Sequence, residues 1–194
     1  MKEQNEVAPT PSQTVGPFFH FALTANAELG RMAGPGARGE RIELAIRVFD
    51  ADAAPVEDCI IELWQADANG KYCHPEDFQE IAPDAALCGF GRMAPDRHGI
   101  ARFETVRPGR VPGRNGDRQA PHINVTVLGR GLLLPLFTRM YFDGDPANAG
   151  DEALAFVPGD RRGTLLAHSD AERPNCWRFD VHLGGAQETV FFDL

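Results

Sequence analysis

Hydrophobic and polar positions alternate along most apolar segments of this chain, with a period of two residues. Residues 42–48 are typical, with isoleucine, leucine, isoleucine and valine at the even positions and Glu43 and Arg47 among the odd ones. Because successive side chains of a β-strand point to opposite faces, this pattern predicts a strand that buries one face. Comparable segments lie at residues 59–65, 100–106, 122–128, 137–142, 177–183 and 189–192. Such a series of short strands predicts a mainly β chain folded as a β-sandwich.

Turn-forming residues separate these segments, and helical signals are few. The chain contains 20 glycines and 15 prolines, most of them between the apolar segments, which is typical of frequent turns. The clearest helical signal is Asp145, which can cap a helix that has Pro146 at its first position and continues to about Ala155. We therefore expect only a few short helices.

A stretch rich in glycine and proline divides the chain near its N-terminus. Residues 33–39 read Ala-Gly-Pro-Gly-Ala-Arg-Gly and cannot hold regular structure. We expect an arm and linker at residues 1–41 and a single β-sandwich domain at residues 42–194. Residues 10–19 combine two prolines, a glycine and two phenylalanines, which predicts an extended N-terminal arm. Such an arm either straps over the protein's own core or reaches into a neighbouring chain or ligand site.

Charge and composition exclude several classes of partner. The net charge is −9, and no cluster of basic residues is longer than Arg161-Arg162, so we expect no nucleic-acid binding. The longest strongly apolar run, residues 132–137, is far shorter than the roughly 20 residues that span a bilayer. The first residues lack the apolar core of a signal peptide, so we expect a cytoplasmic protein. The four cysteines form no Cys-x-x-Cys pair and are expected to be reduced.

One strand carries a row of polar side chains on one face. In residues 122–127 the three apolar residues alternate with His122, Asn124 and Thr126. Two imidazoles separated by one residue on a strand can form half of a metal site, but the second position here is an asparagine. Taken alone, His122 is more simply interpreted as a histidine hydrogen-bonded to a nearby loop.

Seven sequence motifs are spread over nearly the whole chain, and one of them includes the start of this strand. They are Thr-Pro-Ser-Gln-Thr-Val-Gly-Pro-Phe at 10–18, Leu-Trp-Gln-Ala-Asp-Ala-Asn-Gly-Lys-Tyr at 63–72, Gly-Arg at 91–92, Val-Arg-Pro-Gly at 106–109, Ala-Pro-His-Ile-Asn at 120–124, Arg-Met-Tyr-Phe-Asp-Gly-Asp at 139–145 and Thr-Val-Phe-Phe-Asp-Leu at 189–194. In this order they resemble the intradiol ring-cleaving dioxygenases, within them the group that cleaves protocatechuate. The resemblance implies a β-sandwich enzyme of two homologous chains, α and β, in which the β chain binds Fe(III) through two tyrosines and two histidines.

The resemblance can be followed residue by residue at the iron ligands. Tyr72 matches the first tyrosine and His122 matches the first histidine. Val111 stands near the second tyrosine's place, and Asn124 replaces the second histidine. An arginine of the family's pattern falls at or beside Gln119. The resemblance therefore implies a vestigial site and identifies this chain with the α type.

The remaining donors are too few for a ferric ion. Fe(III) is a hard cation whose charge is offset by phenolate ligands, and only one phenol and one imidazole remain at the four positions. Four-ligand metal sites bind with roughly 10–16 kcal/mol, so losing half of the donors forfeits about 5–8 kcal/mol. We expect this chain to bind no metal and to hold no catalytic residue, with Fe(III) bound by the partner β chain.

The resemblance also assigns a role to the arm and to one arginine. Thr14, Gly16 and Pro17 match positions that line the substrate pocket of the partner's iron, and Arg130 matches an arginine that reaches the same pocket. Glycine permits close backbone approach, proline gives a rigid apolar wall, and arginine can bind a carboxylate. Arg130 is then expected to favour the acid over plain catechol. The alternative is that Arg130 is an ordinary solvated turn residue.

The activity implied for the complex is cleavage of 3,4-dihydroxybenzoate by O2, between its two hydroxyl groups, to 3-carboxy-cis,cis-muconate. This chain would support assembly and line the pocket as part of αβ protomers in a higher oligomer, and would be inactive alone. Two alternatives remain open. A free-standing intradiol dioxygenase would have to recruit iron through Tyr72, His122 and unrecognised ligands. A non-enzymatic β-sandwich binding module would have inherited only the scaffold.

Overall fold

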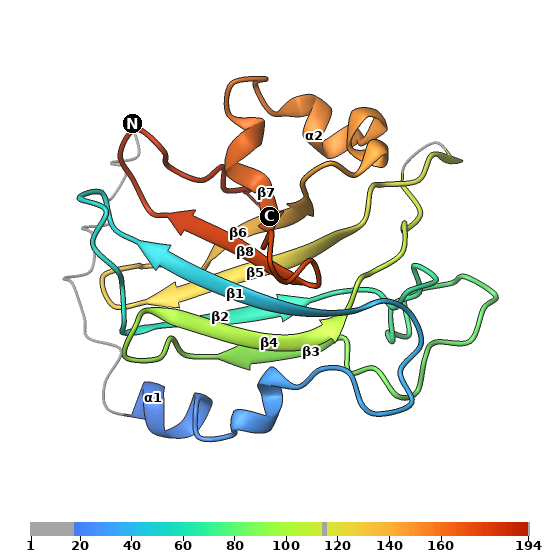
Figure 1. The fold of residues 1–194 in the computed structure, drawn as a ribbon, viewed down its shortest axis with the longest axis horizontal. Helices are drawn as coiled ribbons and strands as arrows, with labels where there is room; N and C mark the ends of the chain where they lie inside the picture. Colours follow the sequence, from blue (N-terminus) through green and yellow to red (C-terminus); the bar gives the residue numbers. More distant parts are fainter. Residues whose placement is uncertain (1–17, 114–115, 194) are drawn as a thin grey trace, which may run out of the picture.

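A computed structural model describes residues 18–113 and 116–193 of the chain (Figure 1). The strands are β1 (Arg41–Phe49), β2 (Cys59–Trp64), β3 (Phe90–Met93), β4 (Ile100–Val106), β5 (His122–Gly129), β6 (Leu136–Phe142), β7 (Leu166–Ser169) and β8 (Cys176–His182). The helices are short: α1 (Phe18–Leu23), η1 (Ala27–Gly30), η3 (Pro146–Gly150), α2 (Glu152–Phe156) and η4 (Arg162–Leu165). The expectation of a mainly β fold with few short helices is confirmed.

The two layers expected of a sandwich are joined into one sheet. Its strand order is β3-β2-β5-β6-β7-β8-β1-β4, and the short strand β7 connects the layers by pairing in parallel with β6 and antiparallel with β8. The sheet therefore curls until its edges β3 and β4 approach each other. The segment after η1 covers both edges, since Arg31 bridges to Glu104 of β4 and Ala33 bridges to Leu87 just before β3. Covering the edges in this way protects unpaired backbone groups from other chains.

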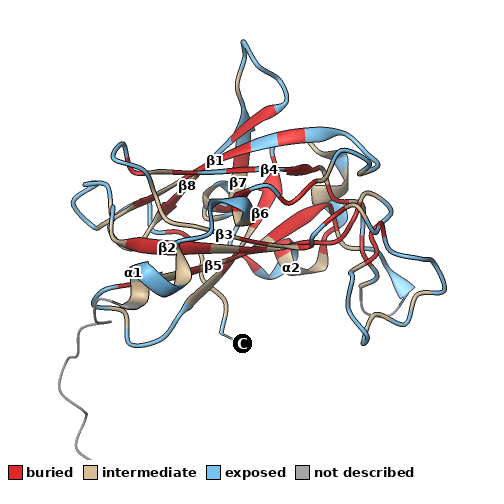
Figure 2. Cartoon of the chain, turned by 90° about the horizontal axis from the view of Figure 1, so that it is seen from below, coloured by how far each residue is buried: buried red, intermediate tan, exposed pale blue. Residues whose placement is uncertain are grey.

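The core fills the space between the layers, and much of the strand ribbon is coloured as buried in Figure 2. The predicted inward face of β1 is buried: the side chains at positions 42, 44, 46 and 48 are at most 2% exposed. Met32 and Ala33, from the covering segment, are equally buried. The cysteines are free thiols as expected, although Cys73 and Cys88 are exposed and only Cys59 and Cys176 pack inside.

The predicted strand at residues 189–192 and the predicted helix from Asp145 both differ in the structure. Residues 189–192 form no strand, because only Thr189 and Phe192 donate backbone hydrogen bonds to neighbouring strands, whereas Val190 N donates to the Thr164 hydroxyl. The expected helix from Asp145 to about Ala155 is two short helices. Asp145 caps η3 as predicted, but Asp151 then starts α2 by accepting from Leu154 N.

The arm is described only in part. Thr14, Gly16 and Pro17 lie outside the described residues, so their expected lining role stays a prediction. Phe18 and Phe19, which were expected to be extended, begin the short helix α1 instead. From α1 through η1 the chain runs along β3 and β4 (Figure 1). None of the described helices is long and apolar enough to cross a membrane.

Candidate functional site

The four positions matched to iron ligands converge at one end of the sheet. His122 and Asn124 open β5, Tyr72 lies in the loop after β2, and Val111 lies in the loop after β4. Tyr72, Val111 and His122 all line one pocket of about 670 Å³. The fold therefore brings together residues that are up to 52 positions apart in sequence, such as Tyr72 and Asn124.

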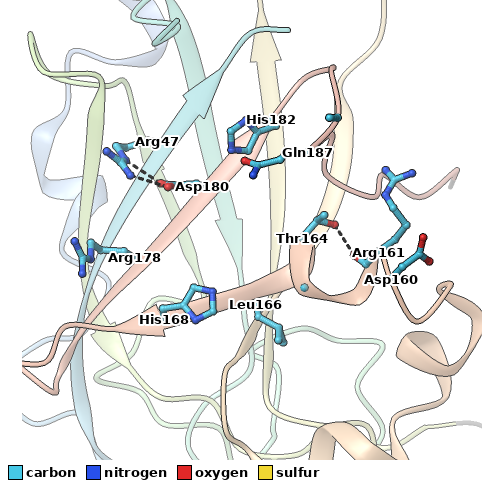
Figure 3. A pocket seen from close by; sticks show the side chains of 12 residues that line it. Arg47, Asp160, Arg161, Thr164, Leu166, His168, Arg178, Asp180, His182 and Gln187 are labelled. Atoms are coloured by element: carbon cyan, nitrogen blue, oxygen red, sulfur yellow. Dashed lines mark hydrogen bonds and ion pairs between the residues drawn. The ribbon is translucent and has the colours of Figure 1, made fainter. Parts of the chain in front are cut away.

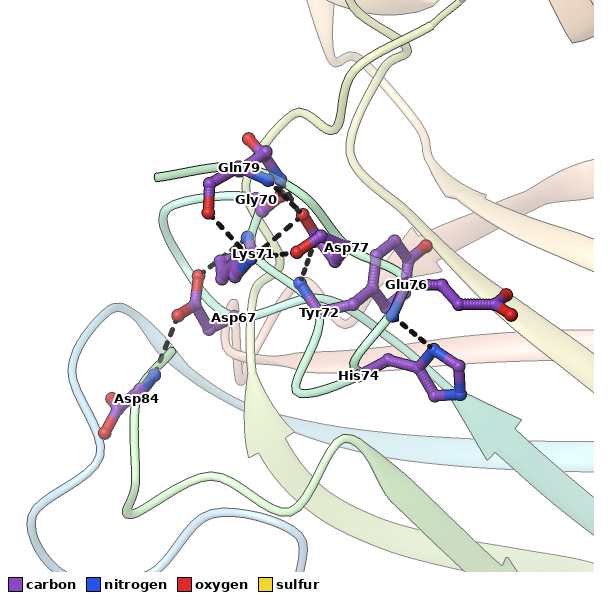
Figure 4. Close-up of polar contacts among 9 residues, drawn as sticks. All are labelled: Asp67, Gly70, Lys71, Tyr72, His74, Glu76, Asp77, Gln79 and Asp84. Atoms are coloured by element: carbon purple, nitrogen blue, oxygen red, sulfur yellow. Dashed lines mark hydrogen bonds and ion pairs between the residues drawn. The ribbon is translucent and has the colours of Figure 1, made fainter. Parts of the chain in front are cut away.

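A rigid turn holds Tyr72 in place (Figure 4). Asp67 accepts hydrogen bonds from the backbone N–H groups of Asn69 and Lys71, at 2.8 and 3.0 Å. Gly70 adopts a φ of +80°, and a Cβ at this position would overlap the carbonyl of Arg110. Only glycine fits such a turn without strain. The turn fixes the direction in which the following residue enters the pocket.

A buried ion pair supports the same loop. Lys71 Nζ lies 3.1 Å from Asp77 Oδ1, and both side chains are at most 10% exposed. Asp77 Oδ2 accepts from Tyr72 N at 2.8 Å. Burial raises the pKa of Asp77, but hydrogen bonds from the Tyr72 and Gln79 backbones and from Lys71 outweigh it and lower the pKa to about 2. The carboxylate is therefore ionised and fully engaged, and its role is to hold the loop.

Tyr72 is a protonated phenol. Its hydroxyl oxygen accepts from Asn124 Nδ2 at 3.4 Å, and its ring lies nearly parallel to Trp64, with 6.0 Å between centroids. Burial raises the pKa of this phenol above its ordinary value, with weaker opposing effects from Asn124 and Arg139. A phenolate, the form that a ferric ion requires, is therefore disfavoured here.

His122 is a neutral imidazole. Its side chain is 3% exposed, and its Nδ1 lies 2.8 Å from the carbonyl oxygen of Ala120, so Nδ1 is the protonated nitrogen. Burial, together with the positive charge of Arg139, lowers the pKa of His122 to about 4. Nε2 is left as the acceptor nitrogen.

These residues do not fit a ferric ion. Val111 offers no donor atom, and the Asn124 amide is engaged with Trp64 O at 3.3 Å as well as with Tyr72. In the part of the chain that the structure describes, histidine, cysteine and acidic side chains form no group of three able to hold a metal. One neutral imidazole and one protonated phenol remain from the four matched positions.

Arg139 is one of several pocket residues to which the sequence pattern assigned no role. It lies on β6 directly across from Asn124 of β5, and its Nη1 donates to Gln119 Oε1 at 2.8 Å and reaches Tyr141 Oη at 3.5 Å. The family's pattern places an arginine at or beside Gln119, and here a guanidinium from the neighbouring strand occupies that neighbourhood. In the sequence, Arg139 stands out only as the first residue of the motif at 139–145, and that motif assigns it no function.

The predicted lining residue Arg130 lies elsewhere. It follows the far end of β5, and at roughly 3.3 Å per residue it is about 26 Å along the strand from His122. Its side chain is 71% exposed and pairs with Asp58 at 2.8 Å. The fold thus separates Arg130 from the pocket of this chain, and its expected role in a partner's pocket stays a prediction.

A second hollow, of about 570 Å³, lies on the outer face of β8 (Figure 3). Arg47 and Asp180 form a two-point ion pair there, with contacts of 2.8 and 2.6 Å. None of the residues predicted to have a functional role lines this hollow.

Comparison with known proteins places the pocket in a family context. The profile of the family described as "Dioxygenase" matches residues 14–185. The protocatechuate 3,4-dioxygenase alpha chain of Burkholderia cepacia is 42% identical, over 95% of this chain and 97% of its own length. The corresponding beta chain of Burkholderia cepacia is 32% identical, over 92% of this chain and 77% of its own. The solved 3-chlorocatechol 1,2-dioxygenase of Rhodococcus opacus has a TM-score of 0.63 at 22% identity, covering 89% of this chain and 71% of its own, and shares the fold.

Proposed function

The chain belongs to the intradiol dioxygenase family, and from that premise we propose that it is the metal-free α subunit of a protocatechuate 3,4-dioxygenase. The single observation that carries the proposal is the donor set of its pocket. Val111 and Asn124 stand where the family's pattern has a tyrosine and a histidine, although the rest of the fold is kept. A chain that keeps the fold and loses the ligands is suited to a structural part in the enzyme.

The iron of such an enzyme belongs to a homologous β chain. The family is iron-dependent in general, and this chain is similar to both an alpha chain and a beta chain of protocatechuate 3,4-dioxygenase. In the proposed complex, the ferric ion would be held by the β chain, and it would supply the chemistry that makes the substrate's dihydroxylated ring reactive toward O2. The overall reaction converts 3,4-dihydroxybenzoate and O2 to 3-carboxy-cis,cis-muconate.

Exposed apolar side chains support an αβ assembly. Leu133 and Leu134 are 82% and 76% exposed, and they lie in the same loop as Arg130, between β5 and β6. Exposed apolar patches of this kind are typical of protein–protein contacts. A β chain seated on this loop would cover the two leucines and receive Arg130 at the edge of its own pocket.

Arg130 can then bind the carboxylate of the substrate. Its ion pair with Asp58 joins two exposed side chains, and such pairs contribute only about 0–1 kcal/mol. A substrate carboxylate in a desolvated interface pocket makes a stronger, charge-assisted hydrogen bond, so it can displace Asp58. Thr14, Gly16 and Pro17 of the arm would form the adjoining wall, with glycine allowing close approach and proline giving rigidity.

The experiment is to produce this chain alone, the β chain alone and both together, and to measure iron content and protocatechuate-dependent oxygen uptake. We expect iron only in preparations that contain the β chain, and full oxygen uptake only in the complex. Stoichiometric iron and ring cleavage in the lone chain would instead favour a free-standing dioxygenase. A stable monomer that ignores the β chain would favour a binding module.

A further inference from the structure

The pocket has a positive charge at its wall, Arg139, that forms no salt bridge with any residue that the structure describes. Arg139 is half-buried, and its Nη1 is hydrogen-bonded to two neutral acceptors, Gln119 Oε1 and Tyr141 Oη. Among the described residues, the ion pairs of the structure include none for Arg139. An anion that enters the pocket can therefore pair with this guanidinium without displacing an acidic partner among the described residues.

None of the described acidic groups near Arg139 serves as its counter-ion. Asp77 is paired with Lys71 and saturated by backbone donors. Asp151 lies behind Tyr141, and it accepts from the Tyr141 hydroxyl and from the backbone N–H groups of two other residues. Glu76 is exposed at the rim of the pocket. The other titratable groups on the wall are uncharged or solvated: His122 is neutral, and His74 is exposed.

Most of the remaining lining is apolar. The Trp64 and Tyr72 rings are within 9° of parallel, and Val111, Pro112 and Phe78 add further apolar side chains. The polar Gln79 also lines the pocket, but its amide donates to Gly70 O and Asp77 Oδ2. Because Val111 is small, space is left open that a tyrosine at this position would fill. The volume of about 670 Å³ lies within the roughly 300–1,000 Å³ of pockets that bind small organic molecules.

We propose that this pocket binds a small aromatic carboxylate, with its carboxylate on Arg139 and its ring against Trp64 and Tyr72. A guanidinium recognises a carboxylate through paired, charge-assisted hydrogen bonds, and aromatic side chains favour a planar ring. The site requires neither a metal nor the β chain, so it stands or falls independently of the proposed function.

Calorimetry on the full 194-residue chain tests the site with three probes. 4-Hydroxybenzoate combines ring and carboxylate, phenol has the ring alone, and acetate has the carboxylate alone. We expect one equivalent of 4-hydroxybenzoate to bind with a Kd of about 1 mM or tighter, and both other probes to bind at least tenfold more weakly. Quenching of Trp64 fluorescence should accompany binding, because Trp177, the other tryptophan, is buried in the core. Equal binding of acetate, or no saturable binding of 4-hydroxybenzoate, would overturn the proposal.

Matched variants locate the site. Arg139→Gln should weaken binding by roughly 10- to 100-fold, as expected when one charged hydrogen-bonding group is lost. Arg178→Gln removes the same charge from an exposed position on β8 and should leave affinity unchanged. Val111→Phe should block the ring space while keeping every charge. If Arg139→Gln fails to fold, Arg139→Lys provides the test of the site instead. It keeps the positive charge but loses the paired donors that bind the carboxylate. Unchanged affinity in a folded Arg139 variant contradicts the assignment.

Discussion

The hydroxyl oxygen of Tyr72 lies 3.4 Å from Nδ2 of Asn124, so two positions that the family's pattern gives to metal ligands instead contact each other. The contact ties the loop after β2 to the start of strand β5. It places a phenol and an amide where a phenolate and an imidazole would converge on iron. A protonated phenol and an engaged amide at these positions disfavour a ferric ion, although the backbone framework of the fold is kept.

Restoring the two lost donors should restore metal binding. In Val111→Tyr/Asn124→His, two phenols and two imidazoles are available, and we expect ferric binding with a visible tyrosinate-to-iron band, whereas the native chain stays colourless. Iron per chain and the visible spectrum are the measurements. Val111→Phe/Asn124→Gln is the control, because it changes the same positions without adding a ligand. A colourless, iron-free Tyr/His variant would mean that donor loss alone does not explain the metal-free site.

Substrate selection by the complex should depend on Arg130. In complexes carrying Arg130→Ala, we expect the ratio of kcat/KM for 3,4-dihydroxybenzoate over catechol to fall by roughly 10- to 100-fold, because one charged hydrogen bond to the carboxylate is lost. Asp58→Asn frees Arg130 from its ion pair and should not lower this ratio. An unchanged ratio in Arg130→Ala would identify Arg130 as an ordinary solvated turn residue.

The turn before Tyr72 should tolerate no side chain at position 70. Gly70→Ala combines a φ of +80° with overlap of its Cβ on the Arg110 carbonyl, so we expect a loss of at least about 2 kcal/mol in the free energy of unfolding. Gly144→Ala provides the matched control, since its φ is +75° but nothing lies within 4 Å of the added atom. That variant should lose only about 1 kcal/mol. Urea titration measures both, and equal losses would exclude a role for the overlap.

Stability should fall in mildly acidic solution because of His122. Its folded-state pKa of about 4 lies below the ordinary value of 6.5, so the unfolded chain binds the proton more readily. Stability is thus complete above pH 6.5 and is lost as the pH falls toward 4, by up to about 3 kcal/mol for this group. His122→Gln should flatten this part of the profile, and the exposed His98→Gln should leave it unchanged. Identical profiles for native and His122→Gln chains would contradict the assignment.

The local pattern predicted the long strands well and the short ones poorly. Strand β1 has nine residues with clear alternation, and its inward face is buried as expected. Strands β3 and β7 have four residues each, too few for a period to be recognised. The C-terminal segment at 189–192 alternates like a strand, but side-chain hydrogen bonds take the place of a ladder there.

The sequence alone determined which donor atoms exist. A valine at 111 and an asparagine at 124 remove two ligands wherever the fold places them, because the identity of a side chain fixes its chemistry. Only the tertiary structure decided which side chains meet. Arg139 lies across from Asn124 and reaches Gln119 because the register between strands β5 and β6 sets these distances. The alternating pattern of a strand fixes which of its faces is buried and so limits the register, but it does not identify which distant segment pairs with that strand.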